Sequence, residues 1–252
     1  MPSTIKPPKS RSAELHRACL IWANAQKSAA SLVDLSDVVI EVRRELGAER
    51  GRHTEQEHDL RRAAVVFAGA GLDAVAKRIL ADVSRDLIAG ELLSNPQEHP
   101  FLKRVARALS ASLISGPSDD SSGRPDRLLL ARLLMSGDAL TEMCQQITDE
   151  LVGGSFQSVE RLRELCNLFG LDARSVVNVR ESELRLALQA RNEIVHEMDV
   201  KLQMRRSRRS RPRDETRRHV ATLLEAGKAL LEAADVRLSQ RSPSTADAKL
   251  VW

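Results

Sequence analysis

The fold is decided by residues 54–90, which read TEQEHDLRRAAVVFAGAGLDAVAKRILADVSRDLIAG. Thr54 and Glu57 match the Thr-x-x-Glu capping box, which satisfies unpaired backbone amides where a helix begins. Apolar and small residues then recur at three- or four-residue intervals, the repeat of one helix face. The stretch is therefore predicted to form one long helix that reaches about Ile88 and ends near Gly90. Its repeating positions are Leu60, Ala64, Phe67, Gly71, Val75 and Ile79.

The middle of this predicted helix has unusually small side chains, because Ala and Gly fill most of residues 63–71. Small side chains let a neighbouring helix approach closely. The same stretch, residues 63–75, is also a candidate interface with another protein.

Helical spacing continues through most of the remaining chain, and no segment alternates apolar and polar residues over the length of a strand. The sequence therefore predicts an all-α helical bundle. Gly47 ends a predicted helix, and Ser182 is the predicted N-cap of another. The further helices are expected at about 12–32, 36–46, 95–115, 127–136, 138–152, 156–169, 182–199 and 214–240.

Composition marks the segments that are predicted to stay outside the bundle. Residues 1–10, rich in Pro, Ser and Lys, are expected to form a disordered arm, and residues 241–252 a disordered tail. Residues 115–126 read as a flexible loop. Residues 11–240 are predicted to form a single all-helical domain, with a candidate insertion around 91–170.

Composition also excludes several classes of function. Aromatic residues make up 2% of the chain, which argues against single-strand binding by rows of stacked rings. Cys19, Cys144 and Cys166 are widely spaced and odd in number, so buried free thiols are expected in place of a disulfide framework or a zinc site. The sequence has no signal-peptide core and no membrane-spanning stretch. We therefore expect a cytoplasmic protein with no membrane anchor, metal or other cofactor.

A short basic segment holds all the excess positive charge of the chain. The net charge is +4, but residues 201–213 contain seven basic side chains and no acidic one. Such a cluster could hold several phosphates of RNA, or it could be a solvated loop or a docking site for an acidic protein. The candidate RNA-binding residues are Lys201, Arg205, Arg206, Arg208, Arg209, Arg211 and Arg213.

The motif that carries chemistry is Arg191-Asn192-Glu193-Ile194-Val195-His196. A histidine can take the proton of a ribose 2′-OH or give one to the leaving 5′-oxygen, and an arginine can hold the phosphate. Asn192 shares a helix face with His196 and can orient the imidazole. Arg191 lies about 140° around the helix from His196, so one helix does not bring them together, but a second copy packed against the first could place two Arg and two His in one cleft.

Arg191-Asn192-x-x-x-His196 followed by Glu197 resembles the signature of HEPN-domain ribonucleases, and residues 61–75 resemble an early core helix of that family. The resemblance implies a metal-independent endoribonuclease of toxin–antitoxin or antiviral defence systems, acting as a homodimer with a composite active site. It implies products with 2′,3′-cyclic phosphate and 5′-hydroxyl ends. Arg191 and His196 take the family's catalytic positions, Asn192 its polar position, and Asp73 is the candidate acidic residue from an earlier helix. A cognate antitoxin or a partner in a defence complex is expected.

Two other interpretations use the same residues. Arg191 could pair with Glu193 or Glu197 while His196 caps the end of the helix, where a cation is favoured. Alternatively, the domain could be a non-catalytic RNA- or DNA-binding module that uses residues 201–213, or a scaffold subunit. His53 and His58, near Glu55 and Glu57, are not spaced to share a metal and are expected to be solvent-exposed.

Overall fold

The computed structural model describes residues 5–8, 12–47, 54–92, 138–197 and 211–240, and every regular element in these ranges is a helix. The all-α prediction is thereby confirmed. None of the described helices combines the length and the apolar character that crossing a bilayer requires. The elements are η1 (Ala13–Leu15), α1 (His16–Glu45), α2 (Glu55–Leu92), α5 (Ala139–Gly153), α6 (Val159–Leu168), α7 (Ala173–Val176), η3 (Asn178–Arg180), α8 (Glu181–Glu197) and α9 (Arg213–Ser239).

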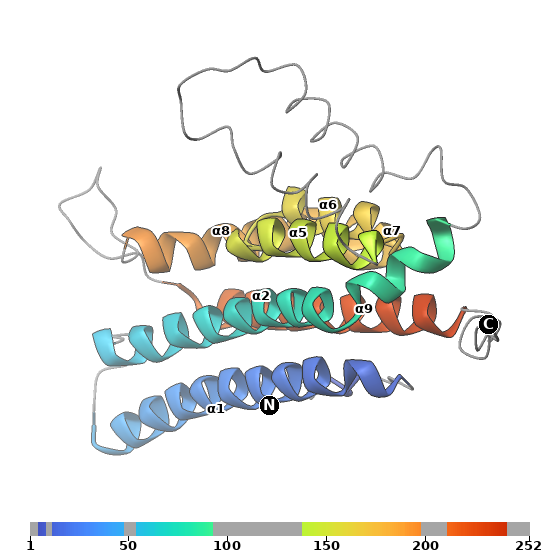
Figure 1. Ribbon diagram of the computed structural model, residues 1–252. Helices are drawn as coiled ribbons and strands as arrows, with labels where there is room; N and C mark the ends of the chain where they lie inside the picture. The colour runs from blue at the N-terminus through green and yellow to red at the C-terminus, as the bar shows by residue number, and fades with distance from the viewer. Residues whose placement is uncertain (1–4, 9–11, 48–53, 93–137, 198–210, 241–252) are drawn as a thin grey trace, which may run out of the picture.

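The helices lie in three layers, with α2 and α9 side by side in the middle (Figure 1). Helix α1 covers one side of this pair, and α8 lies with α5, α6 and α7 on the other (Figure 1). The buried apolar residues form one connected core. Helix α2 has contacts with α1, α5, α8 and α9, which makes it the central element of the described bundle.

Trp22 joins the first, second and last long helices. Its side chain is 1% exposed, and its indole Nε1 donates a hydrogen bond of 2.8 Å to the carbonyl oxygen of Leu224 in α9. Gly227, one turn further along α9, lies beneath the indole ring, because a Cβ there would be 3.2 Å from Trp22 Cδ1. A large ring therefore fits between tightly packed helices only where α9 has no side chain.

The small residues of α2 bring α1 close. A Cβ at Gly71 would lie 2.3 Å from the Cβ of Ala25, which leaves no room for any side chain at residue 71. The predicted close approach is thus confirmed. Phe67, by contrast, belongs to the predicted inward face but is 50% exposed. The buried stripe runs instead through Ala64, Ala68 and Leu72, which shifts Phe67 off the face that α9 covers.

The first helix is longer than predicted. Residues 12–32 and 36–46 were expected to form two helices, but they form the single helix α1, since no Gly or Pro interrupts residues 32–37. Ser36, a plausible helix start, lies buried inside α1. Its hydroxyl accepts a hydrogen bond of 3.2 Å from Arg61 Nε and lies 3.5 Å from the carbonyl oxygen of Glu57. Gly47, with φ +81°, lies just beyond the end of the helix, in agreement with the prediction.

Other boundaries are close to their predicted places. Helix α2 begins after Thr54, whose hydroxyl accepts the Glu57 amide at 3.3 Å, as the capping box predicts. Ser182 is not an N-cap, because the turn η3 runs directly into α8 and places Ser182 inside the helix. The predicted helices at 95–115 and 127–136, the loop 115–126 and the tail 241–252 lie outside the described residues. The single domain over 11–240 and the insertion around 91–170 remain predictions.

Candidate functional site

Helix α8 carries the three motif residues, and it points them in different directions. Its inner side packs Leu184, Ala187, Leu188 and Ile194 into the core, which fixes the helix against α2 and α9. Arg191 and Asn192 are half-buried near this inner side, and His196 is exposed. The apolar periodicity of the helix therefore decides which functional side chain is held and which is open to solvent.

Arg191 is held tightly against α2. A Cβ at Gly69 would lie 2.9 Å from Arg191 Cγ, so the arginine stem fits only because residue 69 has no side chain. The guanidinium donates hydrogen bonds to Gln157 Oε1, in the loop between α5 and α6, and to Asn192 Oδ1 at 3.1 Å. Asn192 Nδ2 lies 3.5 Å from the carbonyl oxygen of Gln157. One loop residue therefore contacts both polar residues of the motif.

The charge of Arg191 has no direct counter-ion within the part of the chain that the structure describes. Its two hydrogen-bond acceptors are neutral amides, and its Nε is buried without a partner there. Burial lowers the pKa of the Arg191 guanidinium, and the Asp73 carboxylate acts in the opposite direction. A partly desolvated cation of this kind is suited to an anionic ligand such as a phosphate.

Asp73 lies one helical turn after Gly69 on α2, close enough to influence Arg191 electrostatically. Its carboxylate accepts the backbone amide of Phe156 at 2.7 Å and the hydroxyl of Ser155 at 3.2 Å, and it pairs with Lys77 at 2.9 Å. Asp73 therefore anchors the loop that carries Gln157 over Arg191. Three predicted site residues, Arg191, Asn192 and Asp73, lie in one neighbourhood.

His196 does not join this neighbourhood. Its imidazole is exposed and forms no hydrogen bond or ion pair with any described residue. Because His196 lies five positions after Arg191 along α8, the two side chains point about 140° apart. Within one protomer, Arg191 and His196 therefore lie apart, as the helical period predicts. The Arg191–Glu193 pairing of the alternative interpretation is not formed, because Arg191 binds Gln157 and Asn192.

The basic segment is described only at its end. Lys201, Arg205, Arg206, Arg208 and Arg209 lie outside the described residues. Arg211 is 3% exposed and pairs with Glu193 at 2.7 Å and with Glu215 at 3.4 Å. Arg213 is exposed and pairs with Asp37, which Arg217 also contacts at 2.5 Å. Arg211 and Arg213 are therefore paired with carboxylates, although residues 201–213 contain no acidic residue themselves.

Two features of the site were missed from the sequence. Gln157 gave no signal, because it lies 34 residues before Arg191 and in a loop. The contacts that run from Glu193 through Arg211 and Glu215 to His219 had a partial signal, since Arg211, Glu215 and His219 are spaced four residues apart where α9 begins.

Titratable residues elsewhere differ in how well they were predicted. Cys144 and Cys166 are buried free thiols, as expected, and burial raises the pKa of each to about 12, while Cys19 is half-buried. His58 is buried, so its predicted exposure is wrong. It lies next to Glu57, which takes part in the contact between α1 and α2. His53 lies outside the described residues. Across the described ranges, no three His, Cys, Asp or Glu side chains gather as a metal site would require.

Comparison of the chain with known protein families, with curated proteins and with solved structures found no match in any of the three.

Proposed function

We propose that the protein is a metal-independent endoribonuclease of the HEPN type, in which His196 transfers protons and Arg191 holds the phosphate. The observation that carries the proposal is the environment of Arg191. Its positive charge is half-buried, positioned by Gln157 and Asn192, and has no carboxylate paired with it among the described residues. A fixed cation in such surroundings stabilises the charge that builds on a phosphate during attack.

In the proposed reaction, the ribose 2′-OH attacks the adjacent phosphorus while an imidazole removes its proton. The bond from phosphorus to the 5′-oxygen breaks, and that oxygen takes a proton from an acid. The products are a 2′,3′-cyclic phosphate and a 5′-hydroxyl. DNA lacks the 2′-OH nucleophile, so the chemistry itself selects RNA. His196 is suited to the proton transfers because its exposed imidazole is not committed to any described partner.

Because Arg191 and His196 point apart, the proposal includes a homodimer in which each cleft combines groups from two copies of α8. Two histidines would then be available, one as base and one as acid. The exposed apolar positions Phe67 and Val195, on α2 and α8, are candidates for the contact between copies. Sedimentation that finds only a monomer at micromolar concentration would overturn the composite cleft.

The first test is cleavage of total RNA in EDTA by the wild type, His196→Ala and His16→Ala. His16 is the matched control, since it is an exposed histidine on α1, outside the candidate site. Wild type and His16→Ala should give fragments with 5′-hydroxyl ends, and His196→Ala should lose at least about a hundredfold in rate. Intact RNA with all three proteins, or equal cleavage by all three, would contradict the proposal.

A mixing experiment tests whether the cleft is shared between copies. Arg191→Ala and His196→Ala should each be inactive alone. If one copy supplies the arginine and the other the histidine, mixing the two variants under conditions that exchange subunits should restore part of the activity. Activity that stays absent after demonstrated exchange would contradict a cleft in which Arg191 of one copy and His196 of the other are sufficient.

The biological role proposed with this activity is that of a growth-inhibiting toxin or an antiviral effector, held in check by a cognate partner. Expression of the wild type should then arrest growth, and expression of His196→Ala should not. An arrest that persists in His196→Ala would separate toxicity from RNA cleavage.

The second candidate function is non-catalytic nucleic-acid binding through the basic segment, and the seven basic side chains in residues 201–213 favour it. Changing Arg205, Arg206, Arg208 and Arg209 to Gln should weaken RNA binding and flatten its salt dependence. RNA binding without cleavage would favour this second function, and no RNA binding would exclude both.

A further inference from the structure

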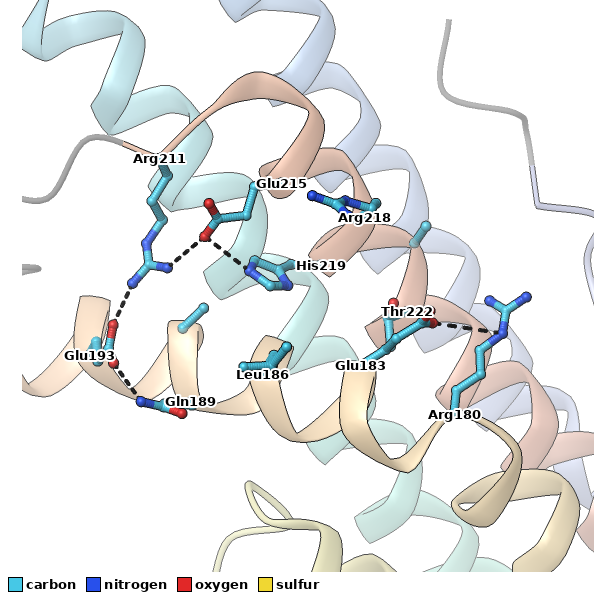
Figure 2. A pocket seen from close by; sticks show the side chains of 12 residues that line it. Arg180, Glu183, Leu186, Gln189, Glu193, Arg211, Glu215, Arg218, His219 and Thr222 are labelled. Carbon is cyan, nitrogen blue, oxygen red and sulfur yellow. Dashed lines mark hydrogen bonds and ion pairs between the residues drawn. The ribbon is translucent and has the colours of Figure 1, made fainter.

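A groove of about 600 Å³ lies between α8 and α9, on the side of α8 away from Gly69 (Figure 2). Glu183, Leu186 and Glu193 come from α8, and Glu215, Arg218 and His219 from α9. Gln189 and Glu193 of the same wall are joined by a hydrogen bond of 2.9 Å. None of the groups at its centre is used in the proposed chemistry.

Both ends of the groove are closed by ion pairs, as Figure 2 shows. At one end the buried guanidinium of Arg211 lies between Glu193 and Glu215. At the other end Arg180 contacts Glu225 and lies 3.9 Å from Glu183. The carboxylates of the groove walls are therefore already engaged by arginines, so their repulsion of an anionic ligand is reduced.

The centre of the groove has a different character. Arg218 is exposed and forms no ion pair or hydrogen bond with any residue in the described ranges. Beside it, His219 is 12% exposed, and its Nε2 lies 3.4 Å from a Glu215 carboxylate oxygen. Burial lowers the pKa of His219, which favours the neutral ring. A neutral ring that donates through Nε2 keeps Nδ1 as a hydrogen-bond acceptor.

The opposite wall of the centre is apolar. Leu186 of α8 is 58% exposed and lies across the groove from His219 (Figure 2). Ala190 of the same helix also lines the groove. An exposed leucine inside a concave, otherwise polar surface indicates a ligand with an apolar face. The centre thus offers one uncompensated positive charge, one neutral acceptor and one apolar surface.

We propose that this groove binds one nucleotide of a single RNA strand, with its phosphate at Arg218 and the face of its base on Leu186. The inference rests on the proposed function, because it takes RNA as the ligand. Gln189, Glu193 and His196 follow one another at four- and three-residue intervals, so His196 lies on the same side of α8 as the groove wall. Arg211, where the basic segment joins α9, closes the same end of the groove.

A strand whose scissile phosphate lies at His196 would therefore pass into this groove on one side. An acidic peptide fits the same surface less well, since it would bring several carboxylates to a single arginine and would leave Leu186 uncovered. A nucleotide brings one charge for one arginine, and a base tolerates contact with an apolar side chain.

The test measures binding of a short, fluorescently labelled 2′-O-methyl RNA, which cannot be cleaved because it lacks the nucleophile. Arg218→Gln should weaken binding about tenfold, the effect of losing one charge-assisted contact, and should reduce the salt slope by about 0.7, as expected for one phosphate contact on a single strand. Leu186→Ser should weaken binding a fewfold and leave the salt slope unchanged. Arg17→Gln is the matched control, since it removes the same charge from an exposed position on α1.

Binding that Arg218→Gln weakens no more than Arg17→Gln would overturn the inference, as would failure of the wild type to bind the probe. Competition by a polyglutamate peptide that depends equally on Arg218 would reassign the groove to acidic peptides. If Arg218→Gln weakens probe binding but RNA stays intact in the cleavage test, the groove is a binding site and the proposed ribonuclease activity is wrong. If cleavage requires His196 but probe binding does not depend on Arg218, the ribonuclease proposal stands and the proposed nucleotide site in the groove is wrong.

Discussion

The two sides of α8 differ in how firmly they hold their functional groups. On one side Arg191 is pressed against Gly69, covered by the Gln157 loop, and half-buried. On the other side His196 is exposed, and the groove beside it is lined by residues of α8 and α9. Under the proposed function, the group that holds the phosphate would be fixed, while the groups that meet the rest of the strand would stay accessible.

The largest expected effect on stability lies on the groove side. Arg211→Met removes the buried counter-charge that Glu193 and Glu215 share, and breaking a buried pair of this kind costs about 3 kcal/mol of unfolding free energy. Urea denaturation gives the value. Arg213→Met is the matched control: Arg213 is exposed, its partner Asp37 is also held by Arg217, and the cost should stay below about 1 kcal/mol. Equal losses in the two variants would mean that Arg211 does not join α8 to α9.

A pair of glycines two residues apart tests the arginine side. Gly71→Ala places a Cβ against Ala25, so α1 and α2 must move apart at a cost of about 1–2 kcal/mol, even after the gain in helix propensity. Gly69→Ala meets only the arginine stem, which can move, so its stability should change by less than about 0.5 kcal/mol. Gly69→Ala should nevertheless reduce RNA cleavage, because Arg191 is displaced from Gln157.

The outcome distinguishes two views of that contact. The two variants should affect different quantities. Gly71→Ala should lower the melting temperature, and Gly69→Ala should mainly lower the rate of RNA cleavage. If Gly69→Ala is as active as the wild type, the position of Arg191 against α2 has no part in the reaction.

The smallest expected effect is the pH dependence contributed by His219. Burial lowers its folded-state pKa below the ordinary value of 6.5, and the Glu215 contact only partly opposes this. The unfolded chain therefore binds more protons as the pH falls through 6.5, so this group's stabilising contribution is complete above that pH and declines below it. The free energy of unfolding should therefore decrease as the pH is lowered from about 7.5 to 5.5. His219→Asn should flatten the decline, whereas an unchanged slope would assign it to other groups.

The helical spacing predicted the all-α fold, the long helix that begins after Thr54 and the place of the motif helix, because apolar periodicity is a local signal. It did not predict that residues 16–45 form one helix, since Ser36 is stabilised inside α1 by Arg61 of another helix. The positions of Arg191 and His196 on opposite sides of one helix follow from its period. Their partners do not, because Gln157 and the α9 residues reach α8 only through tertiary packing.

The scarcity of aromatic residues has a spectroscopic consequence. The chain has no Tyr and two Trp, and Trp22 lies in the contact of α1 with α9, with its Nε1 hydrogen-bonded to Leu224 and its ring on Gly227. Emission from this indole should be blue-shifted while α1, α2 and α9 stay together, and should move to longer wavelength when they part. A change of Trp252 to Phe would leave Trp22 as the single fluorophore. Its emission would then report opening of this three-helix contact separately from events around α8, where the motif lies.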